Sequence, residues 1–511
     1  MLSSQESLAQ KFVNKWFWLY FFAFLIGPIG YIIKVMITRD LLVEEVGMIY
    51  GVMSFIAFLS IYNDLGLTES LSYFLPKYIV EKKYSKAKYL LRIVFITQIC
   101  TSLSIYLLIY FLAPWLSTYY FKADVTSLLR IAWLFFVWIN ILSIATTFFS
   151  SVQDTKLQKW TELIRMLATA IGVSVLFFFG IGDTQKYMIT WIVGLFIGLL
   201  FGIGFLLKKY YIPYFFHAHT EKDVILRKKF FQYAFATLIS ANIGMLLSNI
   251  DMQLIIFFLW SRDVGFYSTY LSLINIPFII LTPIIGFLFP VISELSWRNE
   301  KHKIQEIVSR FWKYFGIIWI WTGFFLFQFS ETLSIVFFWE RFRESWEILA
   351  FSAPFIVLNF LIQISFQVLA GTGQVKKRVA VLWITLIINI ILNLALIPFM
   401  WTKWSALAVG LSWIPLYYMS AKATWLTLHI FGDKEWYKNA LTALCAFAIC
   451  YLLQIQIGEY ISFLDLILAI LIYMTIFGIT NFSMIHEMVV TIKNVRKWGK
   501  SIPPPDTSLP I

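Results

Sequence analysis

Charge is scarce in this chain of 511 residues, of which only 14% are Asp, Glu, Lys or Arg. A globular protein that folds in water carries about 25% charged residues. Here 60% of the residues are hydrophobic and the mean hydropathy is +0.77, which is too apolar for a surface that meets water on all sides. The composition excludes a cytosolic enzyme, a secreted disulfide scaffold and a nucleic-acid-binding domain.

Cysteine and histidine are also sparse. The three cysteines, Cys100, Cys445 and Cys450, lie inside apolar runs without pairing or metal spacing, so no disulfide is expected. The five histidines show no ligand spacing, and the chain has no Gly-rich nucleotide-binding loop. We therefore expect no cofactor and no direct use of ATP.

Long apolar runs recur from one end of the chain to the other. A helix needs about 17 to 25 such residues to cross about 30 Å of hydrocarbon. The sequence therefore predicts an all-α polytopic membrane protein with about 14 transmembrane helices. The expected spans are residues 16–37, 47–75, 89–113, 128–150, 158–180, 187–207, 231–259, 265–291, 311–329, 346–370, 379–400, 404–430, 437–457 and 462–482.

Basic residues are divided unevenly between the two sides of these spans. Of the 41 Lys and Arg, 32 fall in the N-terminus, every second loop and the C-terminus, eight fall on the other side, and Lys34 lies within a span. Cytoplasmic loops retain basic residues, whereas translocated loops do not. The distribution predicts that both termini are cytoplasmic, and it explains the net charge of +13 by membrane topology.

Short motifs recur in the two halves of the chain in the same order. Val46-Gly47 opens the second span and Val264-Gly265 opens the eighth, and paired landmarks follow the third and ninth spans. This spacing predicts a duplicated unit of six helices, with both copies in the same orientation. The predicted organisation is an N-lobe of six helices in residues 1–218, a pseudo-symmetric C-lobe of six in 219–435, and two more helices with a cytoplasmic tail in 436–511.

Several local motifs resemble those of a known family. They are the turn from Thr38 to Gly51, Asp64-Leu65-Gly66-Leu67, Asp251 in the seventh span, and Gly371-Thr372-Gly373. With the arrangement of six, six and two helices, they resemble the multidrug/oligosaccharidyl-lipid/polysaccharide (MOP) superfamily, and within it the bacterial polysaccharide and O-antigen flippases of the Wzx type. The resemblance implies transport by alternating access of two lobes. The number of fourteen helices is similar to that of flippases of lipid-linked precursors, whereas drug exporters of the superfamily usually have twelve.

Lys34 and Asp251 are the most informative charged residues within the spans. A charge at mid-membrane costs about 2.5 to 3.5 kcal/mol on insertion scales, so it is a functional candidate by default. The two Val-Gly motifs are about 218 residues apart, and the same offset maps Lys34 onto Met252, next to Asp251. We expect the two charges to face each other as a gate, or Lys34 to bind phosphate while Asp251 carries a coupling ion. The alternative for Lys34 is snorkelling to the outer interface.

Four other charged residues are candidates with structural alternatives. Asp64 could bind H⁺ or Na⁺, or it could belong to a helix-bending segment whose polar groups are satisfied locally. Arg165 lies one turn from Glu162 and could contact a diphosphate or pair with that residue. Arg92, at the cytoplasmic end of its span, and Arg130, at the outer end, are candidate substrate contacts or interfacial anchors.

Amide side chains are frequent in the second half of the chain. Asn359, Gln363 and Gln367 recur every four residues and therefore share one stripe of a helix. We expect them to line a cavity and bind sugar hydroxyls, with interhelical hydrogen bonding as the alternative. Pro277 and Pro283 predict that the eighth span is the most bent element.

The expected function is transport of an undecaprenyl-diphosphate-linked oligosaccharide from the cytoplasmic to the outer leaflet of a bacterial inner membrane, with H⁺ or Na⁺ as coupling ions. Its expected partners are this lipid-linked glycan, membrane lipids, and the glycan polymerase and glycosyltransferases of the same pathway, with no nucleic acid. The alternatives are a cation-coupled drug antiporter of the same superfamily and a membrane glycan polymerase or ligase. The short outer segments disfavour an enzyme.

Overall fold

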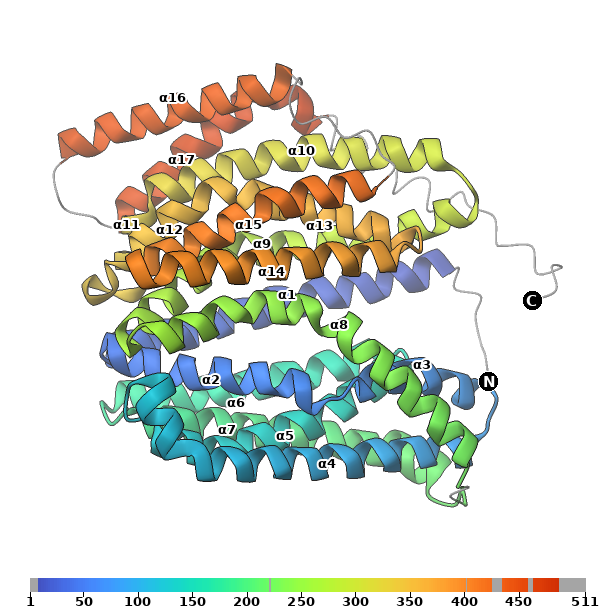
Figure 1. Ribbon diagram of the computed structural model, residues 1–511. Helices are drawn as coiled ribbons and strands as arrows, with labels where there is room; N and C mark the ends of the chain where they lie inside the picture. Colours follow the sequence, from blue (N-terminus) through green and yellow to red (C-terminus); the bar gives the residue numbers. More distant parts are fainter. Residues whose placement is uncertain (1–7, 220–221, 401, 425–433, 458–462, 487–511) are drawn as a thin grey trace.

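The chain folds into a bundle of long helices (Figure 1). The computed structural model describes residues 8–219, 222–400, 402–424, 434–457 and 463–486, and no strand occurs in these ranges. The first half comprises α1 (Leu8–Asp40), α2 (Val43–Asn63), α3 (Leu67–Val80), α4 (Tyr84–Trp115), η1 (Leu116–Phe121), α5 (Thr126–Ser151), α6 (Thr155–Phe178), α7 (Thr184–Leu206) and η2 (Leu207–Phe215). The second half comprises α8 (Val224–Phe258), α9 (Ser261–Trp297), α10 (Lys301–Gln328), α11 (Ser330–Phe338), η3 (Glu340–Phe342), α12 (Ser345–Ser352), η4 (Ala353–Phe355), α13 (Ile356–Gly371), α14 (Val375–Met400), α15 (Thr402–Ala423), α16 (Lys434–Ile457) and α17 (Phe463–Thr480).

The helices have the length and polarity of membrane spans. In the part of the chain that the structure describes, eight helices are long and apolar enough to cross a bilayer, and two bent pairs raise the number to ten. Over its described residues, each of the expected apolar segments coincides with one helix or with consecutive helices, and residues 425–430 and 462 of the expected spans lie outside the described part. The prediction of an all-α polytopic membrane protein is therefore confirmed.

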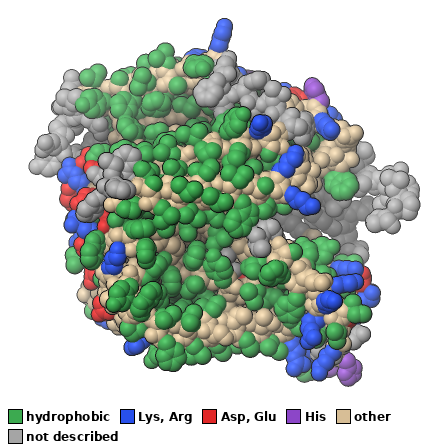
Figure 2. Space-filling view, in the orientation of Figure 1, with side chains coloured by type: hydrophobic (Ala, Val, Ile, Leu, Met, Phe, Trp, Pro, Cys, Tyr) green, Lys and Arg blue, Asp and Glu red, His purple; other side chains and the backbone are tan. Residues whose placement is uncertain are grey.

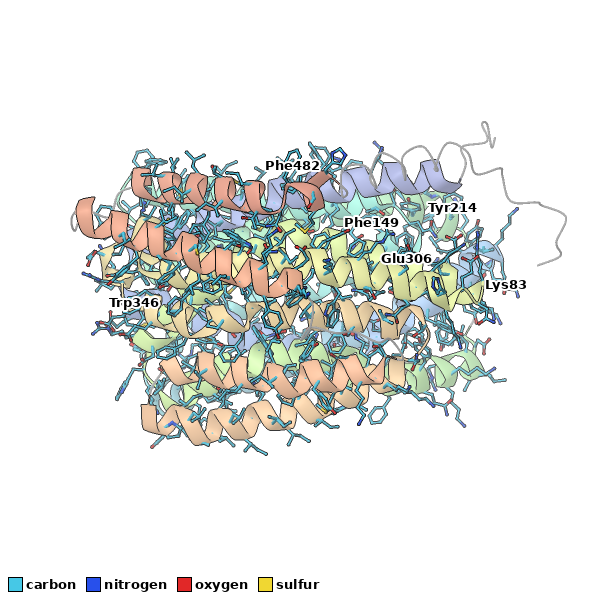
Figure 3. The ribbon with its side chains drawn as sticks, turned by 90° about the horizontal axis from the view of Figure 1, so that it is seen from above. Lys83, Phe149, Tyr214, Glu306, Trp346 and Phe482 are labelled. Atoms are coloured by element: carbon cyan, nitrogen blue, oxygen red, sulfur yellow. The ribbon has the colours of Figure 1, made fainter. Side chains whose placement is uncertain are left out.

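Charged side chains gather at the two ends of the bundle, and the wide face between them is hydrophobic (Figure 2). Lys83 and Glu306 lie at the same end, whereas Trp346 lies at the opposite end (Figure 3). We call the end with Lys83 the basic end. The opposite end, where α1 ends at Asp40 and α2 begins at Val43, is called the sealed end. Under the predicted topology the basic end is cytoplasmic.

The helices form two lobes with the same internal packing. In the N-lobe (α1–α7), α1 lies against α6, α5 lies against α4 and α7, and α6 lies against α7. In the C-lobe (α8–α15), α8 lies against α14, α13 lies against α10 and α15, and α14 lies against α15. The neighbours match one for one when α1 is paired with α8, α4 with α10, and α5, α6 and α7 with α13, α14 and α15. This repetition is the pseudo-symmetry expected of a duplicated unit, although the boundaries at 218/219 and 435/436 stay predictions.

The lobes meet most extensively through α2 and α9, near the sealed end. Gly47 of α2 and Gly265 of α9 form the centre of this contact. A methyl group on Gly47 would lie 1.7 Å from the carbonyl oxygen of Ser261, and one on Gly265 would lie 2.3 Å from that of Val43. Only glycine permits so close an approach of two backbones, which explains why both copies of the repeated Val-Gly motif carry it.

Helix breaks occur where local chemistry allows them. Between α2 and α3, Leu65 and Gly66 adopt left-handed φ values of 50° and 74°. The other sharp breaks are 43° within α8, between Leu238 and Asn242, and 70° between α10 and α11. The eighth span corresponds to α9, which runs as one helix from Ser261 to Trp297, and the expectation that it is the most bent stays a prediction.

The last two helices dock on the C-lobe. Helix α16 packs against α10 and α17. Trp321 Nε1 of α10 donates to Asn439 Oδ1 at 3.0 Å, and Asn481 Nδ2 donates to the same oxygen at 2.7 Å. These buried polar contacts fix both helices to one side of the molecule, and α16 lies above α10 in Figure 1.

Candidate functional site

Lys34 lies at the seam between the lobes, near the sealed end. Its ammonium donates hydrogen bonds of 3.0 Å to both the carbonyl oxygen and the hydroxyl of Ser268 on α9. It also lies 3.3 Å from the centroid of the Tyr50 ring on α2, a cation–π geometry that gains about 2 kcal/mol when desolvated. The side chain is 6% exposed, so it does not snorkel to an interface. Lys34 therefore connects three helices from both lobes.

Further basic side chains cross the seam at the sealed end. Arg39 donates to the carbonyl oxygen of Val336 at 3.1 Å, and Arg341 donates to that of Leu41 at 2.9 Å. Lys122 donates to the carbonyl oxygen of Phe258 at 3.0 Å. In each contact the donor and the acceptor belong to different lobes. We call Arg39, Lys122 and Arg341 the latch residues.

Asp251 of α8 lies inside the C-lobe. Its carboxylate accepts a hydrogen bond of 2.8 Å from Asn393 Nδ2 of α14, and Asn389 is a second amide partner. Asn393 in turn accepts from the Ser405 hydroxyl of α15 at 3.0 Å. A buried carboxylate held by amides and a hydroxyl, without a Lys or Arg partner within 4 Å among the described residues, is suited to binding a proton or a monovalent cation.

Lys34 and Asp251 do not meet in this structure. Lys34 bonds to Ser268 of α9, whereas Asp251 bonds to Asn393 of α14. A direct ion pair between the two charges is therefore not the contact that closes the seam here. Their separate environments fit separate roles.

Asp64 ends α2 and caps α3. Its carboxylate accepts from the backbone N–H and the hydroxyl of Thr68, at 3.2 and 2.8 Å, and from Gln98 Nε2 of α4 at 2.8 Å. The helix-bending alternative for Asp-Leu-Gly is thus observed. The polar groups that surround Asp64 are considered further below.

The three arginine candidates are not brought together with Lys34. Arg92 on α4 and Arg130 on α5 are exposed, and the Arg130 guanidinium lies 5.0 Å from the centroid of the Tyr110 ring. Arg165 is half-buried, with its stem against Gly198 of α7. The expected partner of Arg165, Glu162, accepts a hydrogen bond of 2.8 Å from Lys159 and also interacts with Arg165 through its charge.

The three amides of α13 lie on its more exposed side. Gln363 is exposed and Asn359 and Gln367 are half-buried, whereas Ile362 and Ile364 are buried. Large side chains exposed on the outer face of the neighbouring α14 are apolar, as a lipid-facing surface requires. They are Trp383, Ile384, Ile387, Ile391 and Leu394.

Sequence reasoning missed the acceptors of the seam contacts. Ser268 and the backbone carbonyls that the latch residues contact carry no distinctive signal, because every residue has a carbonyl. Tyr50 lies in a motif used for the resemblance, but its ring was not expected to hold Lys34. The repeated Val-Gly motif is the signal that could have located the seam.

Comparisons with known proteins agree with this architecture. The family model described as "Polysaccharide biosynthesis protein" matches residues 12–296, more than half of the chain. An uncharacterized membrane protein of Methanocaldococcus jannaschii is 23% identical over 410 residues, which cover 77% of this chain and 80% of that protein.

Two solved structures are similar in fold. The lipid II flippase MurJ, in an inward closed conformation, superposes with a TM-score of 0.73 at 15% identity, over 91% of this chain and 99% of its own. An inward-facing multidrug resistance MATE family transporter of the MOP superfamily superposes with a TM-score of 0.64 at 12% identity, over 78% of this chain and 93% of its own. The resemblance seen in the sequence is confirmed. The chain belongs to the polysaccharide biosynthesis protein family, and its fold is similar to that of the MurJ flippase and of the MATE transporter of the MOP superfamily.

Proposed function

We propose that the protein is a flippase that moves a lipid-linked oligosaccharide from the cytoplasmic to the outer leaflet by alternating access, and that it catalyses no covalent chemistry. The proposed cargo is a sugar repeat unit on an undecaprenyl-type diphosphate. The proposed setting is a bacterial inner membrane with both termini in the cytoplasm. Glycosyltransferases would supply the cargo and a glycan polymerase would consume it.

The contacts around Lys34 are the observation that carries this proposal. At the sealed end they join the two pseudo-symmetric lobes through Ser268 and the latch residues, while at the basic end the lobes meet on one flank, where α3 packs on α8. In a rocking mechanism, contacts of this kind form when the outer side is closed and break when it opens. Hydrogen bonds to charged groups contribute about 1.5 to 3 kcal/mol each, so a handful of them could hold one state without making it permanent.

The polar groups in the two lobes suit the two parts of the proposed cargo. The N-lobe supplies cations for a diphosphate, at Lys34, Arg92, Arg130 and Arg165. The C-lobe supplies amides for sugar hydroxyls, at Asn359, Gln363 and Gln367. A lipid tail would remain in the bilayer beside α16 and α17, helices that a twelve-helix transporter lacks.

Asp251 is the proposed coupling site of this cycle. Its carboxylate, the amides of Asn389 and Asn393 and the hydroxyl of Ser405 form a connected set across α8, α14 and α15. Binding H⁺ or Na⁺ there would change the packing of the C-lobe without touching the seam directly. A cation-coupled drug antiporter is the second candidate function, because the MATE transporter shares the fold.

Transport in proteoliposomes tests the proposal. A labelled polyprenyl-diphosphate oligosaccharide is incorporated, and its exposure to a membrane-impermeant glycosidase is followed over time. We expect wild-type protein to increase the accessible fraction, and Lys34→Met to slow this at least about tenfold, since each hydrogen bond lost to a charge costs more than about 1.4 kcal/mol. Lys83→Met is the matched control, because Lys83 is exposed at the basic end and pairs only with Glu81 among the described residues.

A different result in the same assay would identify the antiporter. If wild-type protein leaves the glycolipid on its original side but expels a cationic dye in response to a Na⁺ or H⁺ gradient, the antiporter is the correct function. If Lys34→Met moves the glycolipid at the wild-type rate, the protein is still a flippase, but Lys34 has no role in its mechanism.

A further inference from the structure

The break between α2 and α3 contains a group of oxygen atoms that the seam and the C-lobe site do not use. We propose that Asn63, Asp64 and Gln98 form a binding site for a monovalent alkali cation within the N-lobe. The site joins the end of α2 to the middle of α4. It is separate from Asp251, which lies in the other lobe.

Two hydrogen bonds set the geometry of this site. Gln98 Nε2 donates to Asp64 Oδ1 at 2.8 Å, and Asn63 Nδ2 donates to the Ser102 hydroxyl at 3.0 Å. Gln98 and Ser102 are four residues apart and therefore share one face of α4. The two bonds form adjacent rungs between α2 and α4, one helical turn apart.

Each rung leaves a carbonyl oxygen without a partner. Both amide groups use their nitrogen, so Asn63 Oδ1 and Gln98 Oε1 accept no hydrogen bond from any described residue. Both side chains are 0% exposed. Nearly all buried polar atoms in proteins are satisfied, so two orphaned oxygens beside one carboxylate require an explanation. A cation bound between the two amide oxygens and the Asp64 carboxylate is the partner that we assign to them.

The charge of the site selects the kind of cation. Carboxylate and amide oxygens are the ligands of hard cations. Asp64 is the one carboxylate in the group, and it has no Lys or Arg within 4 Å among the described residues. One negative charge with neutral oxygens balances a monovalent ion such as Na⁺ without excess charge in the membrane. Asp64 is half-buried whereas Asn63 and Gln98 are fully buried, so an ion can enter from the Asp64 side.

The position of the site links it to movement of the lobes. Gly66, two residues beyond Asp64, is so close to α8 that a methyl group on it would lie 2.1 Å from the carbonyl oxygen of Ala234. An ion that fixes the α2–α3 break therefore also fixes the contact of α3 with α8. This role in coupling rests on the transport function proposed above, whereas occupancy of the site does not.

Equilibrium binding of ²²Na⁺ to the purified full-length protein in detergent tests the site without any glycolipid. The assay uses an Asp251→Asn background, so that the C-lobe carboxylate does not contribute. We expect saturable ²²Na⁺ binding and a higher melting temperature in NaCl than in choline chloride of equal ionic strength. Adding Asp64→Asn or Gln98→Met should weaken binding at least about tenfold, the effect typical of a lost ligand or its support.

Gln185→Met is the matched control. Gln185 is an exposed amide of α7 that donates to Ser127 at 3.0 Å, and its loss should leave ²²Na⁺ binding unchanged. The proposal is overturned if the Asp251→Asn protein binds no ²²Na⁺, or if Asp64→Asn leaves binding and the melting temperature response intact. Stabilisation that follows pH but not Na⁺ also overturns it. None of these results depends on the cargo, so the flippase proposal is tested separately.

Discussion

Single residues in this chain are informative when their chemistry is costly in a bilayer. Lys34, Asp64 and Asp251 stand out in the sequence because a charge within a span needs a reason, and the structure gives each of them specific polar partners. The partners could not be predicted from the sequence. Ser268 and the carbonyl of Leu41 are ordinary groups, and only folding brings them to Lys34 and Arg341.

Asp251→Asn tests the coupling role at this scale. The variant keeps the oxygen that accepts from Asn393 but removes the charge, so the fold should survive. We expect transport that no longer responds to a Na⁺ or H⁺ gradient, measured as the glycolipid flipping rate with and without the gradient. A gradient response equal to that of wild type would exclude Asp251 as the coupling residue.

Asp223, in the loop at the basic end, predicts a pH effect on stability. The Leu226 backbone N–H and the Lys86 ammonium, at 2.8 and 2.9 Å, hold the pKa of the Asp223 carboxyl below its ordinary value. A carboxylate with a lowered folded-state pKa contributes stability that is complete above the unfolded value of about 3.9. That contribution is lost as the pH falls through the folded-state pKa.

Asp223→Asn should therefore lower the melting temperature at pH 7, and the difference from wild type should shrink below about pH 4. Thermal unfolding followed by tryptophan fluorescence across this range gives the comparison. Lys86→Met should produce the same trend because it removes the other half of the pair. A difference that stays constant down to pH 3 would contradict the assignment.

Helices were predicted more reliably than their breaks and contacts. Apolar length marks each span because the bilayer requires it, and Asn63-Asp64-Leu65-Gly66 indicates the α2–α3 break because Gly and Asp interrupt helices. The 70° break between α10 and α11 lies at Gln328-Phe329-Ser330, which contains neither Gly nor Pro. The polar residues there end the apolar run predicted for 311–329, so the sequence marks where the span stops but not the angle at which the chain continues.

The glycine contact between α2 and α9 can be tested by adding one methyl group. Gly47→Ala places a Cβ atom against the backbone of Ser261, so the helices must separate. We expect a loss of stability of about 1 to 3 kcal/mol, as for other overpacked contacts, measured by thermal unfolding. Gly204→Ala is the control, since nothing lies within 4 Å of its added methyl group. Equal melting temperatures for the two variants would show that the close approach does not matter.

For the whole molecule, the sequence predicted the class of architecture but not which end of the bundle is closed. The duplicated motifs and the count of spans indicated two similar lobes, which the repeated neighbours of α1–α7 and α8–α15 bear out. Which end of the bundle is closed depends on contacts between residues some 300 positions apart, such as Arg39 with Val336 and Arg341 with Leu41. No local pattern encodes such contacts.

A covalent lock across the sealed end tests alternating access. In a background in which Cys100, Cys445 and Cys450 are replaced by serine, Arg39→Cys and Val336→Cys are joined by a short thiol crosslinker. We expect flipping to stop on crosslinking and to return when a cleavable linker is reduced. Either single cysteine variant treated with the same reagent is the control. Undiminished transport with the lock in place would rule out opening at this end.

Helix α8 of the C-lobe also packs on α3 of the N-lobe, which constrains how the two lobes could separate. Its first half packs on α3, where Tyr73 and Tyr233 stack with ring centroids 4.6 Å apart, and its second half packs on α14. The two lobes are thus held together by α8 at the basic end, on one flank of the molecule. Any widening there must either bend α8 further between Leu238 and Asn242 or occur on the opposite flank, so an opening at the basic end is one-sided.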